Sequence, residues 1–282
     1  MTSPQIIAKG FLFPECPRWR DGAFWFSDCH DGKVIQLSAD GELLDSFSVP
    51  GKPSGLGWLP DGQMLIVSIG ELCVYRRDSG GELHRHGDLS AFHRFHSNDM
   101  VVDRNGNAYV GEVGFRMGID EPRETAVVLV RPDGSVDAAA QSLFTPNGSV
   151  ISEDGKTFIV AESAANRLTA FTIASDGKLI DRRLFAEFEK ADIPDGICLD
   201  DEGCVWIASP FTNSVARVSE RDGIVDRITV PDNRVYACML GGADRRDLYI
   251  CCAPTHDTRK TAALRGGAIA LARVAVPGSG FP

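Results

Sequence analysis

Short hydrophobic segments alternate with polar turns along the whole chain. A typical copy holds one apolar segment, an Asp-Gly or Asn-Gly pair or a close equivalent, and a second apolar segment. Asp-Gly between apolar segments is a strong hairpin signal, because glycine adopts the positive φ that a tight turn needs. The pattern therefore predicts six β-hairpins. They lie at 15–28, 54–68, 98–112, 147–162, 195–209 and 236–252.

The hairpins recur at a nearly constant spacing. Successive turns are 40, 44, 49, 47 and 43 residues apart. The turn residues are Asp21, Asp61, Asn105, Asp154, Asp201 and Asp244. A strand-rich repeat of about 40–50 residues is typical of a β-propeller. We therefore predict an all-β fold, a six-bladed β-propeller with four antiparallel strands per blade, formed as a single domain by residues 1–282.

The two ends of the chain are expected to complete one blade together. The last repeat has candidates for three strands, at 235–241, 247–252 and 267–274, and lacks a fourth. The unassigned segment QIIAKG at 5–10 is the candidate fourth strand, and its pairing would close the ring. An open β-sandwich array is the alternative fold. An α/β fold is disfavoured because no segment keeps a helical apolar period over several turns.

Composition limits the partners and the compartment. The net charge is −10, so phosphate backbones and anionic lipid surfaces are disfavoured, and we expect no nucleic-acid or membrane partner. The first ten residues lack the features of a signal peptide. Most of the eight cysteines lie inside apolar strand patterns, and no CxxC pair occurs. We expect reduced, structural cysteines and a cytoplasmic protein.

Residues able to bind a metal ion recur at the start of the innermost strand. These positions are Glu15, Asn98, Asn147 and Asp195, each at a nearly constant distance before its hairpin turn. In a propeller, the first residues of the innermost strands face one central axis, so the four side chains should meet. Pro-Asn-Gly and Pro-Asp-Gly are also ordinary turn sequences, but periodic placement favours a site.

The donor types indicate which ions the site would take. Two carboxylates and two amides supply only oxygen ligands with a total charge of −2, which suits Ca²⁺, Mg²⁺ or Mn²⁺. Zn²⁺ remains open for a catalytic site with free coordination positions. We expect one divalent metal ion as the cofactor.

The same segments carry a family resemblance. FPECPRW, SNDMVVD, PNGSVIS and PDGICLDDEGCVWIAS resemble the senescence-marker-protein/gluconolactonase (regucalcin-like) family, and the whole chain fits blade by blade. The resemblance implies a lactonase with one divalent metal held by Glu15, Asn147 and Asp195. It implies that Asn98 contacts substrate and the metal site, and that Asp195 also acts as the catalytic base. The four residues also resemble the metal site of phosphotriesterase-type propellers.

One position departs from the family pattern. Many sugar lactonases of the family have an arginine two residues before the Asn98 position, and this chain has His96. His96 is therefore a candidate substrate-binding residue for a lactone other than a sugar-acid lactone, with a loop residue as the alternative.

Loops at the same end of the ring should wall the pocket. The longest of them span 114–125 and 253–266. Glu112 ends a strand beside Asn98, either supporting the site or as a surface charge. The candidate pocket residues from the loops are His30, Phe115, Arg116, Phe211 and His256.

The expected function is hydrolysis of a small-molecule lactone by a metal-dependent, gluconolactonase-like enzyme. No GxSxG motif occurs, which disfavours a serine nucleophile. The alternatives are a phosphotriesterase-type hydrolase on the same site and a calcium-binding propeller without catalysis. We expect a monomer or a weak dimer.

Overall fold

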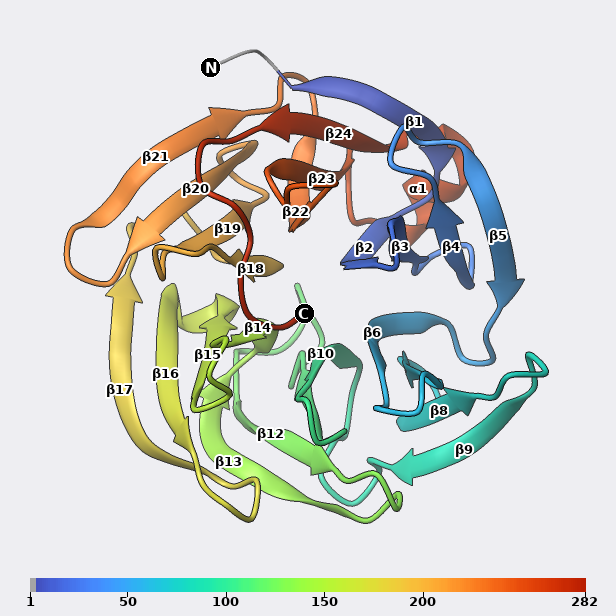
Figure 1. Ribbon diagram of the computed structural model, residues 1–282, viewed down its shortest axis with the longest axis vertical. Helices are drawn as coiled ribbons and strands as arrows, with labels where there is room; N and C mark the ends of the chain where they lie inside the picture. The colour runs from blue at the N-terminus through green and yellow to red at the C-terminus, as the bar shows by residue number, and fades with distance from the viewer. Residues whose placement is uncertain (1–3) are drawn as a thin grey trace.

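Six four-stranded antiparallel sheets are arranged in a ring around a central axis (Figure 1). This arrangement is seen in a computed structural model, which describes residues 4–282. Five sheets follow the chain order from the axis to the rim, and the sixth has the order β22-β23-β24-β1. The predicted all-β, six-bladed propeller is therefore confirmed.

The first three blades come from the first half of the chain. Blade 1 contains β2 (Pro14–Arg20), β3 (Ala23–Asp28), β4 (Lys33–Leu37) and β5 (Leu43–Ser48). Blade 2 contains β6 (Pro53–Trp58), β7 (Met64–Ser68), β8 (Cys73–Arg77) and β9 (Leu83–Asp88). Blade 3 contains β10 (Ser97–Val102), β11 (Ala108–Glu112), β12 (Glu124–Val130) and β13 (Val136–Phe144).

The remaining blades follow in the same direction around the ring. Blade 4 contains β14 (Pro146–Ile151), β15 (Thr157–Glu162), β16 (Arg167–Ile173) and β17 (Leu179–Glu187), with the 3₁₀ helix η1 (Ser163–Ala165) in a loop. Blade 5 contains β18 (Ile197–Leu199), β19 (Val205–Ser209), β20 (Ser214–Ser219) and β21 (Gly223–Thr229). Blade 6 contains β22 (Arg234–Gly241), β23 (Asp247–Ala253), β24 (Gly267–Arg273) and β1 (Gln5–Phe11), with the helix α1 (Thr258–Leu264) before β24.

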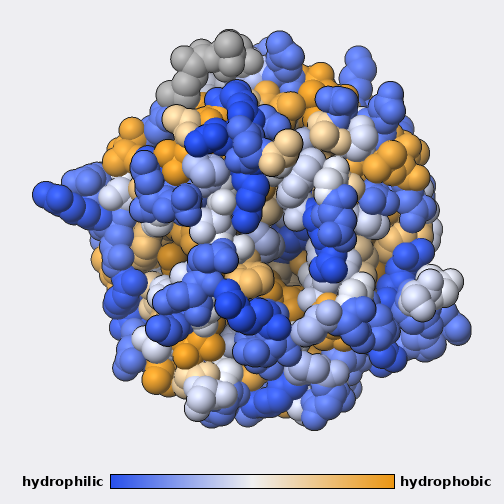
Figure 2. Space-filling view, viewed as in Figure 1, coloured by the Kyte–Doolittle hydropathy of each residue, from blue (hydrophilic) through white to orange (hydrophobic). Residues whose placement is uncertain are grey.

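Burial explains the difference between inner and outer strands. Every residue of β7 (MLIVS) and β19 (VWIAS) is buried, because both faces of these strands pack against other blades. Almost every residue of the outer strand β5 (LLDSFS) is exposed. Hydrophilic side chains accordingly cover most of the face in Figure 2, with hydrophobic ones in separate groups between them.

The hydrophobic core is divided among the interfaces between neighbouring blades. Phe24 of blade 1 stacks on Tyr249 of blade 6, with ring centroids 4.6 Å apart. Val101 and Tyr109 of blade 3 belong to one buried cluster with Phe158 of blade 4. Each blade therefore depends on its neighbours to bury its sheet faces.

We call the residues at the start of the innermost strand of each blade the strand heads. Among them, Asn147 and Asp195 are each directly followed by a glycine that allows neighbouring inner strands to approach closely. A Cβ atom added to Gly148 would lie 2.5 Å from the backbone nitrogen of Ile197, and one added to Gly196 would overlap Ala237. Neither glycine has a positive φ. The Asn-Gly and Asp-Gly pairs at 147–148 and 195–196 thus reflect close backbone contact between blades, which distinguishes them from the hairpin turns.

Strand β1 closes the ring. It pairs antiparallel with β24, with Gln5 opposite Leu271 and Phe11 opposite Gly267. Immediately after β1, the backbone N–H groups of Leu12 and Phe13 donate to the Asp28 carboxylate of blade 1 at 2.9 and 2.8 Å. The prediction that the N-terminal segment completes the last blade is therefore confirmed.

The C-terminal segment lies across the end of the axis opposite the strand heads. Phe281 forms an antiparallel bridge with Ile151, and Gly278 forms one with Asp200. Ile151 ends β14, whereas Asn147 lies near its start. The C-terminus, near the centre of Figure 1, therefore lies at the end of the axis opposite the predicted metal site. Among the described residues, no helix has the length and apolar character needed to cross a bilayer.

Candidate metal centre and substrate cavity

The four predicted metal-binding residues meet in one cavity. Glu15 lies on β2, Asn98 on β10 and Asn147 on β14, and Asp195 lies two residues before β18. All four line a cavity of about 370 Å³. Because these strands belong to four blades, only ring closure brings the residues together.

Hydrogen bonds orient the Asn147 side chain. Its Nδ2 donates to Asp195 Oδ1 at 2.5 Å and to Ser163 Oγ at 3.1 Å. Ser163 Oγ donates in turn to the carbonyl oxygen of Pro194 at 2.7 Å. This amide orientation follows from the hydrogen-bond network. It leaves Asn147 Oδ1 as an available oxygen ligand beside the Asp195 carboxylate.

The two carboxyl groups of the cavity carry raised pKa values. Burial raises the pKa of Glu15 well above its usual range, and the charge of Asp195 adds to the effect. Burial raises the pKa of Asp195 to about 7, against the lowering effect of its hydrogen bond from Asn147. Two desolvated carboxylates side by side favour a bound cation. With two amide oxygens beside them, the donor set fits a hard divalent ion.

A buried ion pair lies beside this site. The Arg18 guanidinium donates to Asp99 at 2.7 Å, to the carbonyl oxygen of Leu56 at 2.8 Å and to that of Pro17 at 2.7 Å. Both side chains of the pair are almost completely buried. Asp99 directly follows Asn98, so the pair fixes the start of β10 against blades 1 and 2. Arg18 is thus committed to Asp99 and does not line the cavity.

The two remaining strand heads have different environments. Ser54 is buried, with its Oγ 3.5 Å from Cys16 Sγ, and does not line the cavity. Tyr236 lines it and packs edge-to-face on Phe13, with ring centroids 4.6 Å apart. Tyr236 Oη is buried without a hydrogen-bond partner in the described part of the chain.

Several predicted substrate-binding residues line the same cavity. They are His30, Asn98, Phe115, Phe211 and His256. His30 stacks on Phe13 at a centroid distance of 4.5 Å, and its Nδ1 lies 2.8 Å from Thr261 Oγ1 of α1. Burial lowers the pKa of His30 to about 4, with smaller effects from Lys52 and His256. His30 is therefore neutral at pH 7.

Three predicted substrate-binding residues lie outside this cavity. His96 is exposed, and its carbonyl oxygen accepts a hydrogen bond from the Val113 N–H at 2.9 Å. Arg116 is also exposed and pairs with Asp120 at 2.7 Å, which turns its charge along its own loop. Both residues lie at the end of the ring that the sequence predicted, but their side chains do not line the cavity.

Glu112 lies outside the cavity, and its burial excludes the interpretation as a surface charge. It is buried, and its Oε1 accepts hydrogen bonds from the backbone N–H groups of Arg94 and Phe95 at 2.6 and 2.8 Å. Thr125 Oγ1 donates to its other oxygen. Glu112 thus holds the loop before β10 and does not line the cavity.

Part of the apolar wall was not predicted from the sequence. Phe13 and Ile193 each lie two residues before a strand head. Because side chains two residues apart on an extended chain point to the same side, this spacing could have indicated that both face the cavity. The others lie in loops without periodicity. The apolar wall residues outside the predicted loops are Phe13, Val113 and Ile193, whereas Met117, Ala164 and Pro210 lie in loops that were expected to wall the pocket but were not named as candidates.

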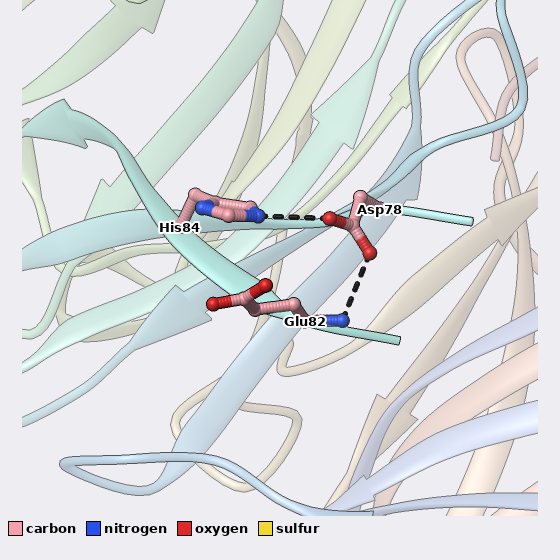
Figure 3. A group of neighbouring side chains, drawn as sticks. All are labelled: Asp78, Glu82 and His84. Atoms are coloured by element: carbon pink, nitrogen blue, oxygen red, sulfur yellow. Dashed lines mark hydrogen bonds and ion pairs between the residues drawn. The ribbon is translucent and has the colours of Figure 1, made fainter. Parts of the chain in front are cut away.

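A second group of possible metal ligands lies on the outer rim of blade 2. Asp78, Glu82 and His84 offer ligand atoms within 4.8 Å of one another (Figure 3). Asp78 Oδ1 already accepts the backbone N–H of Glu82 at 2.9 Å, and Asp78 Oδ2 lies 2.8 Å from His84 Nε2. These bonds stabilise the β8–β9 turn. The group therefore has an adequate structural explanation.

Comparison with known sequences supports a family relationship. The family described as SMP-30/Gluconolactonase/LRE-like region matches residues 13–254, a range that includes all four strand heads. Regucalcin from Gallus gallus is 29% identical over 265 residues, which cover 90% of this chain and 88% of that protein. The 6-deoxy-6-sulfogluconolactonase from Pseudomonas putida is 24% identical over 290 residues, which cover 98% and 96%.

A solved structure agrees in fold. A protein described as the calcium-binding protein regucalcin, from Agrobacterium tumefaciens, has a TM-score of 0.81 to this chain. The match covers 96% of this chain and 93% of that one, at 23% sequence identity. At this level of identity the likeness establishes the shared propeller fold alone.

Proposed function

Because the chain belongs to the SMP-30/gluconolactonase/LRE-like family, we propose that it is a divalent-metal-dependent lactonase. The observation that carries the proposal is the convergence of Glu15, Asn98, Asn147 and Asp195 in one cavity. The name of the Pseudomonas putida relative, a gluconolactonase, supports the reaction class. The product would be the hydroxy acid formed by adding water across the ring ester bond.

The proposed metal ligands are the four strand-head residues. Their oxygen atoms would hold Ca²⁺, Mg²⁺ or Mn²⁺, with Zn²⁺ as the further candidate. A divalent ion bound there supplies a Lewis acid for an ester carbonyl and its developing negative charge. Asn147 holds the Asp195 carboxylate in place through its hydrogen bond to Oδ1, and Ser163 Oγ accepts a second hydrogen bond from the same Asn147 amide.

We assign the proton-accepting step to Asp195. Its Oδ1 accepts the hydrogen bond from Asn147, so Oδ2 is the oxygen available to take a proton from the attacking water. Asn98, from blade 3, is assigned to orienting the substrate. His30 and Phe115 line the space beside these groups and limit its access to bulk water.

A calcium-binding propeller without catalysis is the second candidate. It is favoured by the description of the Agrobacterium tumefaciens protein as calcium-binding. Metal binding without turnover of lactones would support it. A phosphotriesterase-type activity on the same ligands would instead be recognised by hydrolysis of an organophosphate in the same assay series.

The proposal is tested by removing the ligands and the ion separately. Asp195→Asn and Asn147→Ala should abolish calorimetric binding of Ca²⁺, Mn²⁺, Mg²⁺ and Zn²⁺ and lower lactonase kcat/KM by roughly 100-fold or more. Dialysis against EDTA should do the same to the unmodified protein, and re-addition of one of these ions should restore activity. Asp78→Asn, on the outer rim, is the matched acid-to-amide control. Full activity after EDTA dialysis, or in Asp195→Asn, would contradict the proposal.

We further propose a cytoplasmic location and a monomeric or weakly dimeric state. The support for the compartment is that all eight cysteines are buried and free, as expected for a protein of a reducing environment. Sedimentation velocity at two protein concentrations tests the oligomeric state.

A further inference from the structure

We propose that the cavity selects uncharged lactones with an apolar substituent over polyhydroxylated or anionic sugar lactones. This inference rests on the proposed lactonase function and names its substrate class. It follows from three properties of the cavity as the described residues form it: a largely apolar wall, a lining without lysine or arginine, and three polar wall side chains that are already hydrogen-bonded within the protein.

The wall above the metal ligands is largely apolar. Its side chains come from segments far apart in the sequence, so they form a continuous lining only in the folded ring. The apolar side chains that line it include Phe13, Val113, Phe115, Met117, Ile193 and Phe211. Met117 is 60% exposed and Phe211 is 59% exposed. Large apolar side chains exposed at a cavity mouth favour an apolar ligand that covers them.

Within residues 4–282, no lysine or arginine lines the cavity. The pKa of His30 is about 4, and partial desolvation and the nearby charge of Arg234 lower the pKa of His256. Arg234 itself lies over the ring of Phe211, 5.5 Å from its centroid. With Glu15 and Asp195 occupied by the divalent ion, a sulfonate, phosphate or carboxylate held in the apolar wall would lose its hydration without a lysine or arginine among the lining side chains to pair with it.

Three polar side chains of the wall, His30, Thr145 and Ser163, are already hydrogen-bonded within the protein. Thr145 Oγ1 donates to the Val113 carbonyl oxygen at 2.9 Å, and Ser163 Oγ donates to the Pro194 carbonyl oxygen. Tyr236 Oη is unpaired and offers one donor, which a single ester oxygen can accept. The hydroxyl groups of a sugar lactone would lose water here without gaining enough partners, which disfavours their binding.

A lactone series with one ring and different substituents tests the inference. With metal-loaded protein, δ-decalactone should be hydrolysed with a higher kcat/KM than δ-valerolactone, by roughly 3- to 4-fold for each methylene that enters the wall. Glucono-δ-lactone should fall below δ-valerolactone. A higher kcat/KM for glucono-δ-lactone than for δ-decalactone would overturn the inference.

Variants locate the effect. Phe115→Ala and Phe211→Ala should each lower kcat/KM for δ-decalactone by at least about 3-fold more than they lower that for δ-valerolactone. Ile119→Ala is the matched control, because Ile119 is 73% exposed on the same loop as Phe115 and does not line the cavity. Equal losses on both substrates would contradict selection by the wall.

A binding measurement separates this inference from the lactonase proposal. 2-Heptylcyclopentanone, which cannot be hydrolysed, should bind at least about 10-fold more tightly than cyclopentanone, and Phe115→Ala should reduce that difference. If no lactone is hydrolysed but this preference is present, the lactonase proposal fails and the apolar selection stands. If the two ketones bind equally, the apolar selection fails whatever the catalytic result.

Discussion

At the residue scale, the same side-chain type has different roles according to what surrounds it. Glu15 and Glu112 are both carboxylates near the cavity end of an inner strand. Glu15 faces a second carboxylate, which creates a need for a cation. Glu112 satisfies two backbone N–H groups and a threonine hydroxyl, so it needs no ion. Sequence position marked Glu15 as a candidate metal ligand but did not give the role of Glu112, because that role follows from contacts with the loop before β10 and with Thr125.

His30 predicts a pH dependence of stability. Its pKa in the folded protein is about 4, below the unfolded value of ~6.5, because burial disfavours the charged form. As pH falls from about 6.5 to 4, the unfolded chain takes up a proton that the folded protein excludes, so stability is lost over this window. Since His30 is only half-buried, we expect on the order of 1 kcal/mol, or about 2–4 °C in Tm.

Thermal unfolding of metal-free protein between pH 4 and 7.5 measures this effect. The variant His30→Gln should lose less Tm on acidification than the unmodified protein. His96→Gln changes an exposed histidine at the same end of the ring and should follow the unmodified protein. Parallel curves for His30→Gln and the unmodified protein would show that His30 makes no contribution.

At the scale of elements, the hairpin turns allowed the blades to be predicted, but the sequence could not show what the loops do. Asp-Gly turns and alternating apolar positions are local, so they mark the strands directly. His96 and Arg116 lie in segments whose course depends on contacts with Val113 and Asp120. The apolar wall likewise draws on loops of several blades, so only the folded ring reveals it.

The close contact between the inner strands at Gly148 should matter for both stability and metal binding. Gly148→Ala places a methyl group against the Ile197 nitrogen and the Gly196 Cα, both backbone atoms, so the segment that carries Asp195 must move. We expect a loss of about 1–3 kcal/mol in stability and weaker metal binding. Chemical unfolding and calorimetry measure the two effects. Gly80→Ala, where the methyl meets only Asp78 Oδ1 at 3.3 Å, is the control. Unchanged metal affinity in a destabilised Gly148→Ala would separate the glycine from the site.

At the scale of the whole molecule, ring closure and the site depend on the same few residues. β1 completes blade 6, and the chain then passes through Phe13 to Glu15, which is a wall residue followed by a metal ligand. The closing strand was predictable, because the last repeat lacked a strand that the first residues supplied. The course of the C-terminal segment across the axis was not predictable from the sequence. Gly278 and Phe281 form only isolated bridges, to Asp200 and Ile151, and these leave no strand pattern in the sequence.

Breaking the closing strand should therefore harm the whole molecule more than breaking an ordinary outer strand. In Ala8→Pro/Lys9→Pro, two consecutive prolines remove a ladder donor opposite Ile269 and Ala268 and expose the edge of β24. Asp45→Pro/Ser46→Pro makes the same change in β5, opposite Gln36 and Ile35.

Losing β5 frays one blade, whereas losing β1 separates blades 6 and 1 and displaces Glu15. We expect the first variant to have the lower Tm, to self-associate in sedimentation velocity and to lose metal binding in calorimetry, while the second keeps its metal site. Equal Tm values together with intact metal binding in both variants would show that the ring does not need this strand to hold the site.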